Sequence, residues 1–373
     1  MFDSLHIQNF RALEDLELRD LGSVNLLVGR NNIGKTTVLE AIKMRCAGTG
    51  AIWEVEKLLN SRQEIGREPS EEGESRQPWS LERLFYCEAN GTVQAQSRRL
   101  SIGPLGAPES TLRLELGWIR MVRDETGEMT RQVVKDITGF ENDQDIFEAI
   151  IINFGDTPRR IHSPGKMLRL GRLRPGLVDS EIGTVNCHYL PARGFTGNEA
   201  GDLWDKIVLT DLEFDVLSAL KIIEPAIERI SLIQSGASAR RENRMVLVLK
   251  SGSHNPEPLM SLGDGMNRIF EMALGLASSK AGILLVDEVE NGIHYSVQQE
   301  LWSLIFEMAS RLRSQVFATT HSWDCIEAFQ KAASAHPDAG VLIRLDEHDS
   351  KILATIFNEQ QLEILTKESI EVR

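Results

Sequence analysis

A glycine-rich loop that ends in Gly-Lys-Thr is the feature that most constrains this chain. The loop, Gly29-Arg30-Asn31-Asn32-Ile33-Gly34-Lys35-Thr36, follows the apolar run 24–28 and precedes residues 37–42, which are typical of the start of a helix. The order strand, loop, helix is the context in which this pattern, the P-loop, binds nucleotide phosphates. The sequence therefore predicts a nucleotide-binding segment over residues 29–37.

Each residue type in the loop has a chemical reason for its position. Gly29 and Gly34 let the backbone curl so that its N–H groups point at phosphate oxygens. Lys35 brings a cation to the β- and γ-phosphates, and Thr36 offers a hydroxyl to Mg²⁺. The N-terminus of the helix that follows adds partial positive charge. The predicted cofactor-binding segment is completed by Arg30, Asn31, Asn32, Ile33 and Thr37.

Two carboxylates at the end of a second apolar run supply the partner that a P-loop requires. Residues 282–286 are continuously apolar, which is typical of a strand buried on both faces of a parallel sheet, and Asp287 and Glu288 follow directly. Such sheets bind ligands at the ends of their strands. We expect Asp287 to hold Mg²⁺ together with Thr36, and Glu288 to polarise the attacking water. The alternative interpretation is a core strand capped by solvated acids.

A serine and glycine turn lies shortly before this apolar run. Residues 260–265, Met-Ser-Leu-Gly-Asp-Gly, precede a helical stretch over 266–276. Serine and glycines at a helix N-terminus form a second phosphate-binding geometry. Taken by itself, the pattern fits a serine-capped turn equally well.

In this order and spacing, the motifs resemble those of ABC-type ATPases of the SMC, RecF and OLD (overcoming-lysogenisation-defect) kind. The turn matches their signature motif in its S-x-G-acid form. In those families the signature closes over the nucleotide of a second subunit. The resemblance therefore implies that Ser261, Gly263 and Asp264 contact ATP held by a partner protomer.

Two further motifs support the same resemblance. Residues 290–294 stand where these ATPases carry the D-loop, which lies along the dimer seam, although His294 replaces the usual aspartate. A strand-like run over 315–320 ends at His321, which matches the switch histidine. A histidine there can bond the γ-phosphate or the attacking water.

The resemblance covers roughly residues 1–50 and 255–346. Its opening segment implies that Arg11 reaches back to the bound nucleotide. No glutamine is identified as the Q-loop residue, because Gln63 and Gln94 fit by position only. Arg193 ends a Pro-x-Arg segment and faces either a phosphate or solvent.

The resemblance implies an α/β fold: a P-loop NTPase with an ABC-ATPase-like head, a mixed or parallel central sheet, an antiparallel β subdomain and a helical insertion lobe. We expect residues 1–60 and 246–373 to form the ATPase core, and residues 61–245 to form the insertion. Within the insertion, polar composition predicts a mobile loop over 61–79. Apolar spacing predicts a helical region over 202–233.

Composition limits the protein class. The chain has 373 residues, of which 42% are hydrophobic, enough for one large core or two domains. It contains no apolar run of 18 or more residues and no signal-like N-terminus, so we expect no membrane span. Four scattered cysteines show neither zinc spacing nor a disulfide framework, which suits a reducing cytoplasm.

The net charge of −14 argues against a long DNA-binding face. Two basic stretches are local exceptions: residues 159–174 hold six basic residues and no acid, and residues 240–244 hold three arginines. A solvated loop or a protein contact is the simpler interpretation, because the aromatic residues expected for single-strand binding are absent. Nucleic-acid contact stays open.

The sequence thus predicts an ATPase that uses ATP and Mg²⁺ and, by resemblance, forms a homodimer with two ATP molecules between the protomers. About 50 residues follow His321, too few for the Toprim nuclease domain that OLD-type proteins often carry, so we expect a separate nuclease effector or none. This favours the ATPase or sensor component of a bacterial or phage defence or DNA-processing system. The alternatives are a DNA-repair ATPase that binds DNA directly and, as a weaker match, a transporter ATPase subunit.

Overall fold

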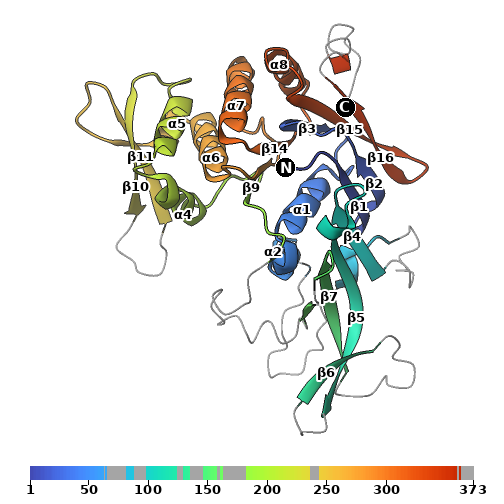
Figure 1. Ribbon diagram of the computed structural model, residues 1–373. Helices are drawn as coiled ribbons and strands as arrows, with labels where there is room; N and C mark the ends of the chain where they lie inside the picture. Colours follow the sequence, from blue (N-terminus) through green and yellow to red (C-terminus); the bar gives the residue numbers. More distant parts are fainter. Residues whose placement is uncertain are drawn as a thin grey trace.

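The computed structural model shows a six-stranded sheet at the centre of the molecule, with a lobe on either side (Figure 1). The order of the strands is β16-β15-β3-β14-β13-β9, and all neighbours are parallel except β15 and β16. These strands are β3 (Val24–Val28), β9 (Cys187–Leu190), β13 (Ile283–Val286), β14 (Gln315–Thr319), β15 (Gly340–His348) and β16 (Lys351–Phe357). The structure describes residues 1–62, 64, 81–87, 98–123, 129–134, 146–157, 160–162, 182–235, 243–358 and 361–362.

Continuous apolar sequence explains why β3, β13 and β14 occupy the middle of this sheet. Every residue of the three strands is buried, as expected for strands covered on both faces. The two amides among them are satisfied. Nδ2 of Asn25 donates to the carbonyls of Gly22 and Val316, and Nε2 of Gln315 donates to those of Phe2 and Gly22. The strands that end at the predicted site are therefore packed on both faces.

Helices that follow the signature turn cover one face of the sheet. Val24, Leu26 and Val28 alternate along β3 and point into the core beneath these helices. Trp302 and Phe329 pack edge to face within this core, with ring centroids 4.9 Å apart. The helices are α6 (Asp264–Ser278), α7 (Gln298–Leu312) and α8 (Trp323–Ala333).

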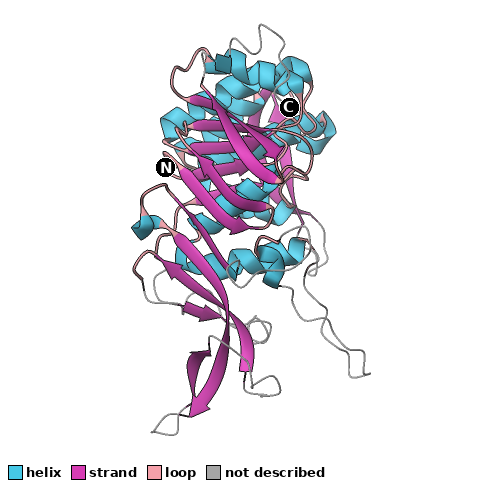
Figure 2. Ribbon diagram, turned by 90° about the vertical axis from the view of Figure 1, so that its right-hand side faces the viewer, coloured by secondary structure: helices cyan, strands magenta, loops and turns pink. Residues whose placement is uncertain are grey.

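The P-loop helix and an antiparallel sheet cover the other face. Leu27, Leu285 and Phe317 point into this second core. The seven-stranded sheet has the order β2-β1-β4-β5-β7-β8, with β6 on β5, and Figure 2 shows its long strands reaching away from the central body. The elements are α1 (Lys35–Cys46), α2 (Ala51–Ser61), β1 (Leu5–Phe10), β2 (Leu13–Leu18), β4 (Arg99–Gly103), β5 (Leu112–Arg123), β6 (Met129–Val134), β7 (Ile146–Phe154) and β8 (Arg160–His162).

A lobe of two helices and three strands lies beside α6 (Figure 1). Trp204 packs on Phe270 of α6, and Arg244 fastens the lobe internally through two bonds to Asp205, at 2.6 and 2.7 Å. Its elements are α4 (Gly197–Ile207), α5 (Asp211–Leu220), β10 (Ile227–Ser235), β11 (Asn243–Lys250) and β12 (Glu257–Pro258). The predicted α/β P-loop fold, with a mixed central sheet, an antiparallel β subdomain and a helical lobe, is confirmed.

The helical prediction for residues 202–233 is wrong at its C-terminal end. The helix α5 ends at Leu220, and residues 227–233 belong to strand β10. Pro225 removes a backbone donor and disfavours helical geometry at the residue before it. Beyond it, Ile230 and Leu232 alternate with polar residues at the period of a strand.

Several sequence predictions lie outside the described residues. They are Gln63, Gln94, most of the 61–79 segment and most of the basic stretch 159–174. The proposed domain boundaries stay a prediction. In the described part of the chain, no helix has the length and apolar character needed to cross a bilayer.

Candidate nucleotide-binding site

The P-loop joins the carboxyl end of β3 to the N-terminus of α1, as the sequence predicts. Gly29 has a φ of 140°, and a Cβ atom there would lie 2.5 Å from the carbonyl oxygen of Leu345, so only glycine fits. The first turn of α1 carries no acidic residue, which leaves its positive end available to an anion. The loop therefore has the shape and polarity of a phosphate cradle.

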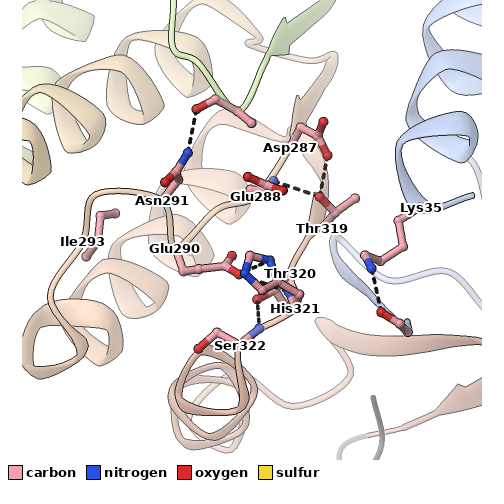
Figure 3. A network of polar contacts seen from close by, with 12 residues as sticks. Lys35, Asp287, Glu288, Glu290, Asn291, Ile293, Thr319, Thr320, His321 and Ser322 are labelled. Atoms are coloured by element: carbon pink, nitrogen blue, oxygen red, sulfur yellow. Dashed lines mark hydrogen bonds and ion pairs between the residues drawn. The ribbon is translucent and has the colours of Figure 1, made fainter. Parts of the chain in front are cut away.

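Lys35 bends back over its own loop. Its Nζ donates to the carbonyl oxygens of Gly29, at 2.6 Å, and Arg30, at 3.0 Å; Figure 3 draws a bond from this lysine to a loop carbonyl. Burial lowers the pKa of Lys35, and the carboxylates of Glu290, Asp287 and Glu288 act in the opposite direction. The ammonium group thus lies in the electric field of three acids, while its hydrogen bonds go to its own loop.

Asp287 is held by hydroxyl groups from three different elements. Thr36 Oγ1 donates to its two carboxylate oxygens at 3.1 and 3.2 Å. Thr319 Oγ1 at the end of β14 donates at 2.7 Å, and Tyr189 of β9 donates at 3.3 Å. Burial, followed by the charge of Asp287, raises the pKa of Tyr189, so the phenol stays a donor. The carboxylate is fixed at the edge where the parallel strands end.

The contact between Thr36 and Asp287 brings together the two predicted Mg²⁺ ligands. Hydroxyl and carboxylate oxygens suit this hard cation, which usually combines few protein ligands with water and substrate phosphates. Among the described residues there is no group of three or more His, Cys, Asp or Glu that could hold a metal. The oxygens of Thr36 and Asp287 are the protein groups that would hold a magnesium ion here.

Glu288 has a left-handed backbone, with a φ of 50°. This conformation is uncommon for residues other than glycine and requires support from its surroundings. Its N–H donates to Thr319 Oγ1 at 2.8 Å, and its carbonyl accepts from Arg268 at 3.1 Å. The backbone at the predicted hydrolytic residue is thus fixed from two sides.

Arg268, which the sequence analysis did not identify, lies buried behind the two acids. One guanidinium nitrogen donates to the carbonyl of Asp287 at 2.6 Å, and the other donates to the carbonyl of Pro191 at 2.8 Å. Arg268 lies four residues after the start of α6, whose N-terminus carries the signature turn. The helix that begins at the signature turn is therefore hydrogen-bonded to the backbone of the two acids that the sequence predicts to be functional.

A second buried acid accompanies this arginine. Glu271 accepts from the backbone N–H of Phe195, at 3.1 Å, and from Asn267 Nδ2, at 3.0 Å. Its Oε2 lies 3.8 Å from Arg268 Nη1. Burial raises the pKa of Glu271 to about 7, against the opposing charge of Arg268. Arg268 and Glu271 stand on a helix face that is otherwise apolar. A charged residue at such a position is the sequence signal that could have indicated both.

His321 contacts Glu290, and Figure 3 shows the two side chains pointing toward each other. Glu290 Oε1 accepts from the backbone N–H of His321 at 3.0 Å and lies 3.1 Å from its Nδ1. The histidine follows the end of β14, one residue beyond Thr320, as predicted. The sequence places Glu290 in the D-loop but gives no sign of its contact with this histidine.

The signature turn and the D-loop pack against each other. Ser261 and Gly263 are exposed, and Gly263 has a φ of 101° as it leads into α6. A Cβ atom on Gly265 would lie 2.9 Å from the carbonyl oxygen of Gly292. Ser261 Oγ donates to the carbonyl of Pro258 at 2.6 Å. Between described residues, no hydrogen bond joins this turn to the P-loop of the same chain.

Asp264 and His294 lie on the same exposed side. Asp264 is the first residue of α6, and its Cβ would be 3.4 Å from a Cβ on Gly292. His294 accepts from the N–H of Ser296 at 3.3 Å, and its ring lies against that of Tyr295, with centroids 4.3 Å apart and planes tilted by 37°. His294 therefore caps the turn that follows the D-loop.

Arg11 does not reach the P-loop in this structure. Its guanidinium is buried and donates to both carboxylate oxygens of Glu64, at 3.2 and 3.0 Å. Its Nε lies 3.7 Å from Glu40 of α1. Burial raises the pKa of Glu40, and the charges of Arg62 and Arg11 act in the opposite direction. The nucleotide contact expected for Arg11 stays a prediction that requires this pair to open. Arg193 is exposed.

Two family models match the parts of the chain that carry these motifs. Residues 1–46 match a family described as "AAA ATPase domain". Residues 199–324 match a family described as "AAA domain, putative AbiEii toxin, Type IV TA system". The two segments hold the P-loop, the signature turn, the acidic pair and the switch histidine.

A protein of Helicobacter pylori named "ATP/GTP phosphatase" is 22% identical over 352 residues, which cover 88% of this chain and 87% of that protein. The chain is an ATPase. An uncharacterized protein of Methanocaldococcus jannaschii is 41% identical over 44 residues, but this match spans only 12% of the ATPase and 20% of the archaeal protein.

Solved structures of SMC heads are similar at low identity. A head bound to the C-terminal winged-helix domain of ScpA gives a TM-score of 0.49 at 11% identity, and covers 95% of the ATPase and 98% of that chain. The SMC head domain of Thermotoga maritima gives a TM-score of 0.44 at 12% identity, covering 96% and 100%. These scores are too low to define the fold, which rests on the strand order given above.

We expect Lys35→Ala to weaken ATP binding by about 3–5 kcal/mol, because it removes the main cation at the phosphates. Calorimetry with ATP and Mg²⁺ measures the change. Lys57→Ala, which removes an exposed lysine of α2, is the control and should bind as the wild type does. Near-wild-type affinity in folded Lys35→Ala protein would contradict the P-loop assignment.

We also expect Glu271 to make stability depend on pH. Its pKa of about 7 in the folded protein exceeds its ordinary value of 4.5, so the folded state holds a proton that the unfolded chain releases between these values. This contribution to stability is complete below about pH 4.5 and is lost as pH rises through 7. Glu271→Gln removes the titration and keeps an acceptor for Phe195.

Urea unfolding between pH 5 and pH 8 tests this expectation. The free energy of unfolding of the wild type should fall with pH relative to that of Glu271→Gln. Glu307→Gln, on the exposed side of α7, should follow the wild type. Parallel pH curves for the wild type and Glu271→Gln would show that Glu271 does not titrate in this range.

Proposed function

We propose that this ATPase belongs to the ABC-type kind represented by SMC, RecF and OLD proteins, and that two copies enclose two ATP molecules. The observation that carries the proposal is the position of the signature turn. It is exposed, it opens a fifteen-residue helix, and it packs on the D-loop and not on its own P-loop. A helix N-terminus in that position is suited to receive a phosphate from a second subunit.

Hydrolysis then depends on residues from both protomers. The segment 29–37 binds ATP, and Lys35 exchanges its loop carbonyls for the phosphates. Thr36 and Asp287 hold Mg²⁺, which when bound neutralises charge on the phosphate oxygens. Glu288 polarises the attacking water, and His321 responds to the γ-phosphate. Ser261, Gly263 and Asp264 complete the site of the partner.

Arg268 supplies a route from the partner's nucleotide to the hydrolytic residue. The arginine ties α6 to the carbonyls of Asp287 and Glu288, at 2.6 and 3.1 Å. A phosphate bound at the N-terminus of α6 therefore acts on a helix that is bonded directly to the acidic pair. This arrangement supports ATP as the switch and the dimer as its readout.

The biological setting that we favour is a bacterial or phage defence or DNA-processing module that acts through a separate effector. The matched family description names a putative toxin, which fits a component that works with a partner protein. A cytoplasmic location fits the four cysteines, all of which are free. No described residue specifically favours direct DNA binding: Arg244, in the second basic stretch, is engaged by Asp205.

Glu288→Gln should bind ATP normally but hydrolyse it about 10²–10⁴ times more slowly, because the amide keeps the size of the side chain and removes the base. Steady-state phosphate release and nucleotide binding measure the two effects separately. If turnover is unchanged while Asp287→Ala abolishes it, another group positions the water.

Ser261→Arg should leave ATP binding to the monomer nearly intact and block both dimerisation and hydrolysis. The added bulk and cation at the N-terminus of α6 oppose a phosphate and the helix dipole. Light scattering with ATP measures dimerisation, with Glu288→Gln protein as the standard for the trapped dimer.

Complementation gives the sharper result for this variant. A mixture of Ser261→Arg and Lys35→Ala chains forms heterodimers with one intact site, made from the P-loop of the first and the signature of the second. We expect ATPase activity to return in the mixture. Normal hydrolysis by monomeric Ser261→Arg protein would rule out the composite site.

A further inference from the structure

We propose that Glu290 is a positioning residue for His321: it holds the ring so that only Nε2 remains free to act at the nucleotide. The inference rests on the proposed function, which gives His321 its place in hydrolysis. It begins from the geometry of one carboxylate oxygen, Glu290 Oε1, which contacts two atoms of the histidine, the backbone nitrogen and Nδ1 (Figure 3).

The first step concerns the hydrogen on the ring. An ionised carboxylate accepts hydrogen bonds and repels a nitrogen lone pair, so the 3.1 Å ion-pair contact favours a hydrogen on Nδ1 of His321. In the neutral imidazole, Nε2 then carries the lone pair and can accept from a water molecule. In the imidazolium form, Nε2 becomes a donor to phosphate oxygen. Either way, Glu290 decides which nitrogen performs the function.

The second step concerns rigidity. The side chain of Glu290 is 9% exposed, whereas that of His321 is 52% exposed. The backbone N–H of His321 donates a hydrogen bond to the side-chain oxygen Glu290 Oε1 at 3.0 Å, and this bond fixes the distance between the D-loop and the turn after β14. An exposed histidine in a turn has several side-chain rotamers, and a buried acid that contacts it at two points restricts them.

The third step concerns the charge of Glu290. Three carboxylates raise the pKa of Lys35 against the effect of burial, and the contribution of Glu290 is larger than those of Asp287 and Glu288. The charge of Glu290 also acts to raise the pKa of Arg268 and the pKa of the Cys325 thiol in α8. Glu290 Oε2 is buried and has no hydrogen-bond partner. A buried acid with one oxygen unsatisfied has a structural cost, which is consistent with a functional role for the other oxygen.

The consequence is a link between the dimer seam and the switch histidine. Glu290 is the first residue of the segment 290–294, which packs on the signature turn through Gly292 and Gly265. A shift of the D-loop on dimer closure would therefore move the carboxylate that holds the His321 ring. Hydrolysis would respond to the partner through this contact as well as through the signature.

The test separates binding from turnover in purified full-length protein. Glu290→Ala should reduce kcat by about 10- to 100-fold, as for loss of a residue that orients a functional histidine, and change ATP affinity by less than about threefold. Glu290→Asp keeps the charge but withdraws it by one methylene, so it should show a similar loss. Glu290→Gln keeps an acceptor oxygen at the same reach and should recover most of the lost kcat.

A double-mutant cycle with His321→Ala supplies the decisive comparison. If Glu290 acts only through the histidine, Glu290→Ala should reduce kcat no further in the His321→Ala background. Glu300→Ala, an exposed acid at the start of α7, is the matched control and should be as active as the wild type. Thermal unfolding shows whether each variant is folded. If Glu290→Ala is not folded, Glu290→Asp takes its place in the cycle.

Two results would overturn the inference while leaving the proposed function intact. One is wild-type turnover by both Glu290→Ala and Glu290→Asp when His321→Ala is impaired. The other is a reduction of kcat by Glu290→Ala that is as large in the His321→Ala background as in the wild type, which would assign Glu290 an independent role. Full activity of His321→Ala would instead remove His321 from the proposed mechanism, and the inference with it.

Discussion

The carboxylate of Asp287 is the point on which the arrangement of this site depends. Parallel strands bring their carboxyl ends to one edge, so β9, β13 and β14 each deliver a polar group there. Tyr189 and Thr319 reach Asp287 from the two neighbouring strands, and Thr36 reaches it from the P-loop helix. Because these bonds cross between elements that are far apart in sequence, they set the separation between the P-loop and the acidic strand. A cation between Thr36 and Asp287 would replace the hydrogen bond that already holds the P-loop helix beside the acidic strand.

A buried cation, Arg268, gives the same edge its second constraint. An unpaired charge in a core is strongly unfavourable, so the guanidinium must find acceptors. It finds three backbone carbonyls, of Pro191, Asp287 and Glu288, and it lies 3.8 Å from a Glu271 oxygen. Carbonyl acceptors belong to the backbone, and therefore the arginine fixes the path of the chain at the acids and not only their side chains. The left-handed φ of Glu288 persists in this surrounding, with Thr319 holding its N–H.

The motifs that depend on a local sequence pattern could be predicted from the sequence alone. The P-loop, the buried strands β13 and β14 and the helix α6 follow from continuous apolar runs and from glycines at defined places, and the structure has them where they were expected. The contacts of Arg268 and Tyr189 could not be predicted, because they depend on which strands become neighbours. The helical prediction failed beyond Leu220 because apolar spacing was extended past Pro225, which ends that pattern. Arg11 illustrates a different limit: the resemblance indicated a nucleotide contact, whereas burial of Glu40 and Glu64 beside it determines its partner here.

The helix α6 connects these local facts into a mechanism. Its N-terminus is exposed and, among the described residues, makes no hydrogen bond to the P-loop of its own chain. Its middle carries Arg268, which donates hydrogen bonds to the backbone of the acidic pair. Small residues let it lie close to its neighbours: a Cβ atom on Gly275 would lie 2.8 Å from a methyl group of Leu284 in β13, and one on Gly265 would lie 2.9 Å from Gly292 in the D-loop. A helix packed this closely transmits a displacement instead of absorbing it, since there is no free volume to take it up. A phosphate drawn to the N-terminus of α6 would thus act on β13 and on the D-loop together, and both lead directly to Asp287, Glu288 and Glu290.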